Sequence, residues 1–364
     1  MEILVVAGDP SGDQHAARLA AALKKARPGL KIAAIGGPAL KAVADDFIED
    51  LASRGVTGFW EPVLKLPFLL KLLGRVGRLL RARRPAALVC VDYYGFNRRV
   101  LALAKSAGVP AYYYVSPQVW ASRPGRVNVL KRLVRKMLVI FPFEEKIYRD
   151  RGVPCEFVGH PLLDVVPKPK ANDHEGVTVG ILPGSRRSEV ARHLPLMLKS
   201  FEIFKRKFPR SRAVVFASPT LSDSEYPAGV TLIREKNYAE RAALDLALCS
   251  SGTATLENAL LGVPMVVVYK LSWPTYLVAR AIIRVPYIAM ANLLAGKALA
   301  PELIQHDATP EKVAAAAVGL LEDPRAYARV KEELAALRAK LSDRGAPSSE
   351  RAARALLADL AAAA

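Results

Sequence analysis

Short apolar runs that end in glycine or a small polar residue alternate along this chain with segments of helical pattern. In the first half the runs are EILVVAGDPSG, KIAAIGGP, AALVCVDYYG, PAYYYVSPQ and KMLVIFPFE. The same rhythm restarts with VTVGILPGS, AVVFASP, VTLIRE, LDLALCSSG and VPMVVVYK. Strand, turn and helix in this order are typical of parallel sheets with helices on both faces. We therefore predict an α/β fold of two doubly wound domains, with an interdomain cleft where ligands lie beyond the carboxyl ends of the strands.

The 364 residues of the chain suit two domains of ordinary size. Residues 165–176, VVPKPKANDHEG, are rich in proline and charge and lack a periodic pattern, which is typical of a linker. We predict a first domain over 1–165, a linker over 166–176 and a second domain over 177–340. The helical tail, 341–364, leaves two arrangements open, because it can pack on the first domain or on another subunit of a homodimer.

Composition excludes several classes of protein. No run reaches the roughly 18 apolar residues of a transmembrane helix, and the first residues, MEILVVAGDPSGD, predict a strand and a turn instead of a secretion signal. The three cysteines, Cys90, Cys155 and Cys249, lie far apart and form no CxxC pair. Disulfides and a zinc cage are therefore not expected, and the expected compartment is a reducing cytoplasm.

The charge of the chain predicts an anionic partner. The formal net charge is +19 and the pI is near 9.9, which suits nucleic acid, an anionic membrane surface or a phosphorylated substrate. Residues 65–84, KLPFLLKLLGRVGRLLRARR, hold seven basic residues and no acidic one. The basic residues are Lys65, Lys71, Arg75, Arg78, Arg81, Arg83 and Arg84. On a helical wheel Lys71, Arg75 and Arg78 share one narrow stripe. The opposite face holds Leu69, Leu72, Leu73, Val76, Leu79 and Leu80.

A basic amphipathic helix with a leucine face is typical of a segment that lies in a membrane interface among anionic headgroups. Two alternatives stay open, an ordinary surface helix that packs its leucines on the core and a nucleic-acid site. Gly74, Gly77 and Pro67 weaken the helix prediction. The stretch lacks interleaved aromatic residues and the chain has no recognised nucleic-acid motif. We therefore predict an anionic membrane partner and no nucleic acid.

The stretch SGTATLE follows the apolar run LDLALCS and precedes a helical pattern. Its hydroxyl residues can cap a helix start, and Gly252 lets a ligand approach the backbone closely. Free N–H groups and the helix dipole then form an anion site, with Glu257 about one turn further on, where it can accept from ribose hydroxyls. The alternative is a capped helix with nothing bound. The predicted cradle comprises Ser251, Gly252, Thr253, Ala254 and Thr255.

A second candidate is the turn in VGILPGSRRSEV, where Arg186 follows Gly184 and Ser185 at a helix start. A guanidinium there can grip a diphosphate through two hydrogen bonds. The alternative is a simple turn with a solvated arginine. Two such turns in one domain favour a nucleoside diphosphate as ligand.

Two further motifs place carboxylates after strands of the first half. In AGDPSGD, which is not a GxGxxG fingerprint, Asp9, Ser11 and Asp13 suit sugar hydroxyls; the alternative is a polar turn with a helix cap. In VCVDYYGFN, Asp92 follows directly after an apolar strand. Partial desolvation there raises the proton affinity of its carboxylate, which suits a general base. The alternative for Asp92 is a helix cap.

Metal and hydrolase signatures are missing from the sequence. The five histidines form no HxxxH or HExxH pair, and no DxD pair is present to hold a metal against a diphosphate. No GxSxG elbow or Walker A motif occurs. We predict no metal and no cofactor, and the hydrolase and kinase classes are disfavoured.

Taken together these segments resemble lipid-A-disaccharide synthases, glycosyltransferases of the GT-B type. The motifs follow in order through most of the chain: AGDPSGD, IGGP, VDYYGFN, SPQVWASRPGRV, FPFE, VGHPLLD, ILPGSRRSE, SGTATLE, VVVYK, ANLLAG and PELIQ. Their order and spacing are specific, whereas single motifs such as VGHPL occur in other UDP-sugar enzymes of this fold. The resemblance implies two Rossmann-like domains.

The resemblance also implies a reaction. A 2,3-diacylglucosamine unit passes from UDP-2,3-diacylglucosamine to 2,3-diacylglucosamine 1-phosphate (lipid X), giving a β-1,6-linked disaccharide 1-phosphate and UDP with inversion and without a metal. Asp92 would deprotonate the acceptor 6-hydroxyl, while Arg186 and the helix start after Ser251 would stabilise departing UDP. Glu257 would bind the uridine ribose. Further residues implied to line the cleft are Asn292, Glu302 and Gln305.

The acylated substrates imply a peripheral enzyme on the inner face of the cytoplasmic membrane of a Gram-negative-type bacterium. The residues expected to contact acyl chains or membrane are Phe68, Leu69, Leu72, Leu73 and Val76. The chain departs from the family pattern at Asp9, Tyr94 and Ser122, which bears on acceptor fit and acyl-chain preference and leaves open a paralogue that acts on another acylated sugar. Two rivals also stay open, a UDP-sugar 2-epimerase of the same architecture and a non-catalytic membrane-binding protein.

Overall fold

The computed structural model describes residues 1–53, 66–169, 175–283, 285–341 and 345–362. The chain forms two compact units. Unit 1 consists of Met1–Asp164 with Leu341–Ala364, and unit 2 consists of Val165–Lys340. Lys65 and residues 170–174 of the predicted linker lie outside the described residues.

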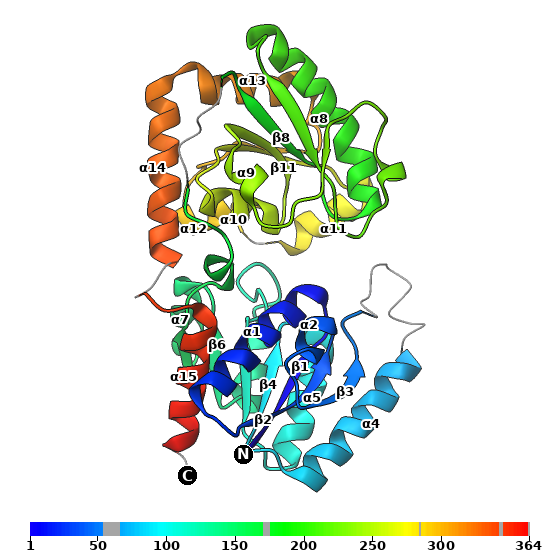
Figure 1. Ribbon diagram of the computed structural model, residues 1–364, viewed down its shortest axis with the longest axis vertical. Helices are drawn as coiled ribbons and strands as arrows, with labels where there is room; N and C mark the ends of the chain where they lie inside the picture. The colour runs from blue at the N-terminus through cyan, green and yellow to red at the C-terminus, as the bar shows by residue number, and fades with distance from the viewer. Residues whose placement is uncertain (54–65, 170–174, 284, 342–344, 363–364) are drawn as a thin grey trace. The chain divides into compact units, whose positions relative to one another are not determined.

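Unit 1 is built on a parallel sheet of seven strands in the order β3-β2-β1-β4-β5-β6-β7 (Figure 1). In chain order the strands are β1 (Glu2–Ala7), β2 (Lys31–Gly36), β3 (Asp46–Asp50), β4 (Ala87–Val91), β5 (Ala111–Tyr114), β6 (Lys136–Val139) and β7 (Cys155–Phe157). The strand order reverses between β1 and β4. Ligands of doubly wound sheets bind at such a reversal, beyond the carboxyl ends of the strands.

Helices cover both faces of this sheet. On one face α4 (Leu66–Arg83), α5 (Tyr94–Ser106) and α6 (Arg126–Leu133) join a single apolar cluster with strand residues. The other face carries α1 (Pro10–Ala26), with α15 (Ser348–Ala361) packed along it (Figure 1). The shorter helices of the unit are α2 (Pro38–Lys41), α7 (Pro142–Arg149) and a 3-10 turn over Pro161–Asp164. The predicted helical tail thus returns to unit 1.

Unit 2 repeats this architecture with six parallel strands in the order β10-β9-β8-β11-β12-β13. The strands are β8 (Thr178–Leu182), β9 (Arg212–Phe216), β10 (Leu232–Ile233), β11 (Leu246–Ser250), β12 (Met265–Tyr269) and β13 (Glu302–Ile304). The helices are α8 (Arg187–Lys207), α9 (Ala239–Ala242), α10 (Thr253–Leu260), α11 (Trp273–Ile282), α12 (Met290–Ala295), α13 (Pro310–Glu322) and α14 (Pro324–Leu341), with a 3-10 turn over Asp223–Glu225. Here the strand order reverses between β8 and β11. The prediction of two doubly wound α/β domains is confirmed.

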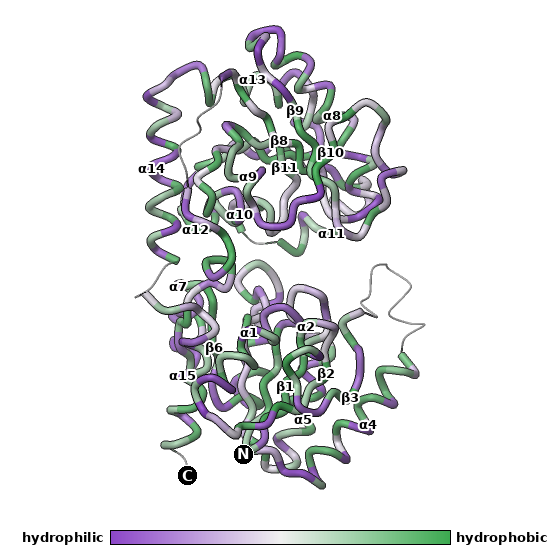
Figure 2. The backbone as a smooth tube through the Cα atoms, viewed as in Figure 1, coloured by the Kyte–Doolittle hydropathy of each residue, from purple (hydrophilic) through white to green (hydrophobic). Residues whose placement is uncertain are grey.

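Hydropathy along the backbone follows this layering. Figure 2 shows apolar residues concentrated in the strands of both sheets, while the surrounding helices mix apolar and polar residues. Strands buried on both faces need apolar residues at successive positions, which explains the continuous runs seen in the sequence. None of the described helices is long and apolar enough to cross a membrane.

The leucine face of α4 divides between core and surface, which corrects part of the membrane prediction. Leu72 and Val76 are buried in the core of unit 1, because they pack against the strands and α5. Their assignment as membrane contacts is therefore wrong. Phe68, Leu69 and Leu73 are half-buried against the same cluster. The exposed apolar side chains of the helix are Leu66 and Leu70.

Candidate functional site

Strand register brings the two predicted anion-binding turns of unit 2 together. Leu182 at the end of β8 pairs with Cys249 near the end of β11, so the turns that follow these strands leave the sheet side by side. A pocket of about 540 Å³ opens there, at the point where the strand order reverses. Its lining includes the predicted residues Arg186, Ser251, Gly252, Thr253, Ala254 and Glu257.

Helix α10 begins at this pocket without a side-chain cap, which corrects the prediction that hydroxyls cap it. Its N-cap residue is Gly252, whose φ of +155° favours glycine. The Ser251 hydroxyl instead donates to the carbonyl of Ile288 at 2.9 Å. The Thr255 hydroxyl donates to the carbonyl of Gly252 and accepts from the amide of Met290. Because no side chain caps this helix, its first N–H groups can bind an anion.

The turn before α8 is built around Glu189. Its carboxylate accepts from the amides of Ser185 and Arg186 at 3.0 and 3.3 Å and from the Arg186 guanidinium at 2.7 Å. Gly184 is required beside it, since φ is +124° and a Cβ atom would lie 2.6 Å from the carboxylate. The Arg186 side chain remains 67% exposed. It is therefore held at the pocket with donors to spare for an anion.

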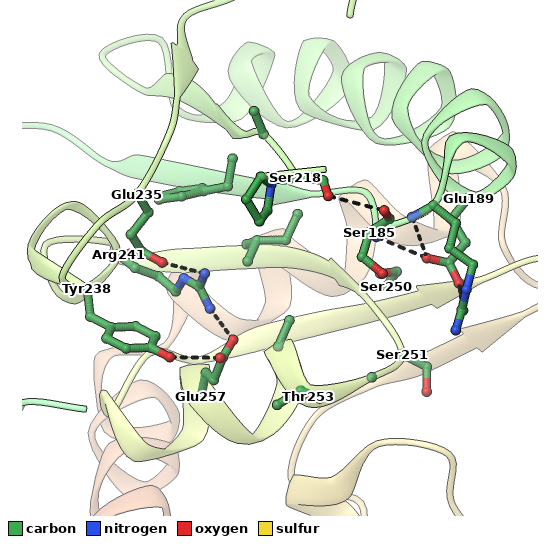
Figure 3. A pocket seen from close by; sticks show the side chains of 18 of the residues that line it. Ser185, Glu189, Ser218, Glu235, Tyr238, Arg241, Ser250, Ser251, Thr253 and Glu257 are labelled. Carbon is green, nitrogen blue, oxygen red and sulfur yellow. Dashed lines mark hydrogen bonds and ion pairs between the residues drawn. The ribbon is translucent and has the colours of Figure 1, made fainter. Parts of the chain in front are cut away.

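A buried ionic cluster forms the other end of the pocket (Figure 3). The guanidinium of Arg241 pairs with Glu235 at 2.5 Å and with Glu257 at 2.6 Å. Tyr238 donates to the second oxygen of Glu257 at 2.9 Å. Burial opposes the charge of Arg241, but the two carboxylates outweigh it and raise the pKa of the guanidinium. Glu257 is thereby held with both oxygens engaged, and each keeps a lone pair for a hydroxyl donor.

Sequence patterns did not single out Glu235, Tyr238 or Arg241. Burial raises the pKa of Glu235 despite the opposing charge of Arg241, and one of its oxygens has no hydrogen-bond partner among the described residues. The sequence did carry a signal for Glu235, because it follows β10 at the same carboxyl end of the sheet as the turns after β8 and β11.

The other predicted residues of unit 2 hold loops and do not line this pocket. Asn292 is fully buried, bonds the backbone of Ala300 and donates to Glu302. Glu302 also accepts from the amides of Ile288 and Ala289. Gln305 bonds the backbone of Leu271 through both ends of its amide. These contacts fix the loops that precede α11 and α12.

In unit 1 the register places Asp9 and Asp92 together. Ala7 at the end of β1 pairs with Val91 at the end of β4, again where the strand order reverses. Burial and the neighbouring Asp9 raise the pKa of Asp92 to about 6. Burial likewise raises the pKa of Asp9, which caps α1 through a 2.7 Å bond from the amide of Gly12. The pair therefore offers a carboxyl group whose proton affinity suits base catalysis near neutral pH.

Backbone strain accompanies Asp92. It and Tyr93 have φ of +48° and +45°, a left-handed conformation uncommon outside glycine and typical of functional sites. The turn is held because Tyr113 donates to the carbonyl of Asp92 at 2.5 Å and Asn97 donates to it at 2.8 Å. Gly8 is also required, since any Cβ atom there would meet the ring of Tyr93 at 2.0 Å.

The remaining predicted polar residues of unit 1 differ in role. Asp13 is buried, and its carboxylate accepts from three amides at the start of α2, so it stabilises that helix. Ser11 is exposed, with its hydroxyl 3.5 Å from the imidazole of His15. Tyr94, one of the departures from the family pattern, stacks under the guanidinium of Arg126 at 4.4 Å.

Glu144 is a buried carboxyl group that sequence reasoning did not single out. It accepts from the hydroxyl of Ser116 and, at 3.2 Å, from the indole of Trp120. It also accepts from the amides of Ile140 and Phe141 at the start of α7. Burial raises its pKa to about 7. Glu144 thus ties the loop after β5 to the loop after β6.

Within the described ranges, no three His, Cys, Asp or Glu side chains gather to hold a metal ion.

Comparisons with known proteins identify the family of the chain. Residues 3–356 match the family model described as lipid-A-disaccharide synthetase. A lipid-A-disaccharide synthase of Syntrophus aciditrophicus is 42% identical over 368 residues, covering 96% of each chain.

Solved structures share the fold at low sequence identity. A UDP-GlcNAc 2-epimerase of Neisseria meningitidis bound to UDP-GlcNAc is 12% identical, with a TM-score of 0.62 and 100% of both chains covered. Acinetobacter baumannii MurG is 18% identical, with a TM-score of 0.57 and 98% of this chain and 99% of that chain covered. Both likenesses concern the fold alone, which is that of GT-B glycosyltransferases. The family match spans nearly the whole chain, and this chain therefore belongs to the lipid-A-disaccharide synthase family, glycosyltransferases of lipid A biosynthesis.

Proposed function

We propose that the chain transfers 2,3-diacylglucosamine from UDP-2,3-diacylglucosamine to the 6-hydroxyl of 2,3-diacylglucosamine 1-phosphate, with inversion at the anomeric carbon. The products are the β-1,6-linked disaccharide 1-phosphate and UDP. One observation carries the proposal beyond family membership: the pocket of unit 2 joins an uncapped helix start, an arginine and an ion-paired carboxylate. The helix start and the arginine suit a diphosphate, and the carboxylate suits the hydroxyls of a ribose. Together they match a nucleoside diphosphate.

The pocket of unit 2 stabilises the leaving group. The N–H groups at the start of α10 and the guanidinium of Arg186 receive the negative charge that develops on UDP as the anomeric bond breaks. Arg241 and Tyr238 hold the Glu257 carboxylate in one orientation, so that it accepts from the ribose hydroxyls.

Unit 1 supplies the base. As the acceptor O6 forms its bond to the anomeric carbon, the bond from that carbon to the UDP oxygen breaks, and the O6 proton passes to Asp92. Above pH of about 6 the Asp92 carboxyl is ionised and ready to accept it. Asp9 sustains this proton affinity by its negative charge.

Helix α4 is the proposed contact with the inner face of the cytoplasmic membrane. Leu66 and Leu70 are exposed, Lys71 is exposed beside them, and the helix has no acidic residue. Exposed leucines and cations together suit the headgroup region of an anionic bilayer.

The reaction is tested with both acylated substrates in mixed micelles, with disaccharide phosphate detected by mass spectrometry. We expect product at the same rate with and without a chelator, because the helix start and Arg186 supply the positive charge that a metal would. Product only with added metal would contradict the proposed leaving-group stabilisation. Conversion of UDP-N-acetylglucosamine to its 2-epimer, without disaccharide, would favour the epimerase alternative.

Arg186 gives a second test with its neighbour as control. The Arg186→Ala variant should lower kcat/KM for the donor by about tenfold or more, since a charge-assisted bond to the diphosphate is lost. Arg187 is 78% exposed and pairs with Glu225, outside the pocket lining. The Arg187→Ala variant should leave kcat/KM nearly unchanged. Equal losses in the two variants would remove Arg186 from the proposed site.

A further inference from the structure

Helix α11 begins beside the nucleotide pocket. It follows β12, which pairs with β11, and β11 leads directly into the pocket. His193 fixes this position, because it accepts from the amide of Lys270 at 3.0 Å and donates to the carbonyl of Pro183 at 2.9 Å. The start of α11 is thereby tied to the turn that carries Arg186.

The outer surface of α11 is apolar, the reverse of an ordinary surface helix. None of its residues is buried. At helical spacing Trp273 and Leu277 form one row, and Val278 and Ile282 lie on the adjacent row. Their exposed fractions are 61%, 60%, 59% and 42%, and Ile283 just beyond the helix is 43% exposed. These are five of the eight large apolar side chains that the described residues expose, so they form a concentrated patch.

Along the sequence the charge around α11 is of one sign. Residues 258–301 contain no aspartate or glutamate but include Lys270, Arg280, Arg284 and Lys297, of which Lys297 pairs with Glu333 of α14. Trp273 packs edge-to-face against Tyr276 at 5.8 Å between ring centroids. Tryptophan and tyrosine with flanking cations are typical of the boundary between acyl chains and headgroups. The chemistry therefore complements an anionic lipid surface.

We propose that α11 is a lipid-contacting element of unit 2, whose partner is the interface of an anionic phospholipid bilayer. Resting on the proposed function, this adds to the α4 contact of unit 1 a second contact on the unit that holds the donor nucleotide. An acylated sugar nucleotide then reaches the pocket of unit 2 while its acyl chains stay in the bilayer.

The test is co-sedimentation of the full chain with vesicles of phosphatidylethanolamine and phosphatidylglycerol. The Leu277→Ser/Val278→Ser variant should bind these vesicles about tenfold more weakly than the unchanged chain. Its affinity for UDP, measured by calorimetry, should stay the same because α11 does not line the pocket. The matched control is Ala335→Ser/Ala336→Ser on exposed positions of α14, which should bind vesicles normally.

Both pairs of substitutions are repeated in a Leu66→Ser/Leu70→Ser background, so that α4 cannot mask the effect. Unchanged vesicle binding by the α11 variant in both backgrounds would overturn the proposal. The same holds if the substitutions only dissociate a dimer in lipid-free buffer, which would assign the patch to a second copy of the chain. If vesicle binding falls as expected while the unchanged chain makes no disaccharide, the lipid contact stands and the proposed reaction fails.

Discussion

The Asp92→Asn variant is expected to lose disaccharide formation by about a thousandfold, in the range of a positioned general base. Asparagine keeps the shape of the side chain and can still accept from the amide of Tyr93, so the strained turn is preserved. It cannot take the proton of the acceptor hydroxyl. The measurement is kcat/KM in the micelle assay, and near-normal transfer by this variant would remove Asp92 as the base.

The same substitution should stabilise unit 1. The folded-state pKa of Asp92 is raised to about 6, whereas an unfolded aspartate titrates near about 3.9. The charged form is therefore disfavoured in the folded state, by roughly 3 kcal/mol above pH of about 6. This penalty disappears as pH falls below the unfolded value. Thermal unfolding should thus show the variant more stable at neutral pH and equal to the unchanged chain in acid.

The pH profile gives an independent check on the base. For the unchanged chain kcat/KM should fall about tenfold per pH unit below about 6, as Asp92 becomes protonated. Asp9→Asn removes the nearby negative charge and keeps a good helix cap. The acid limb should then shift to lower pH. A limb that stays in place would show that Asp9 does not act on Asp92.

The second large effect is expected on stability, from Arg241→Met. Arg241 is 9% exposed and neutralises Glu235 and Glu257, so its removal leaves two buried carboxylates without a counter-charge. Breaking a buried ion pair on one side typically costs about 3–5 kcal/mol. Denaturant unfolding measures the loss directly. UDP binding should weaken as well, because Glu257 loses the group that orients it.

Two controls separate charge from packing. Arg234→Met changes a neighbouring, more exposed arginine that pairs with Asp223, and should cost far less. Adding Glu235→Gln and Glu257→Gln to Arg241→Met removes the uncompensated charges and should restore most of the stability. If the triple variant is as unstable as the single one, shape and not charge accounts for the loss.

Sequence patterns predicted the interior of each sheet better than its edges. Every apolar run quoted from the sequence forms a strand, but β3, β7 and β13 were not predicted. All three lie at the edges of their sheets and are largely half-buried, so no continuous apolar run marks them. The α4 leucines show a related limit. A helical wheel identifies an apolar face, yet core and bilayer both accept it, and only packing assigns Leu72 and Val76 to the core.

The residues of the candidate site were also predicted unevenly. Turn residues that follow central strands, such as Arg186, Gly252 and Asp92, were predictable because strand ends converge at one edge of a sheet. The ionic cluster was not predicted. Glu235 ends the quoted run VTLIRE and so carried a signal, but Tyr238 and Arg241 belong to a segment without a periodic pattern. The roles of Ser251 and Thr255 were also misjudged. A hydroxyl at a helix start suggests a cap, but here each one bonds a loop that lies far along the chain.

The return of α15 to unit 1 has a consequence for how the protein is made. Tyr112 on β5 donates to Asp359, and Ser348 bonds both Asp164 and the hydroxyl of Tyr114. A ribosome releases all of unit 2 before it releases these partners. Vectorial synthesis therefore completes unit 2 first and leaves unit 1, which carries Asp92, unfinished. Unit 1 is complete only after α15 has been translated, so a chain that terminated before Ser348 would hold all of unit 2 and an unfinished unit 1.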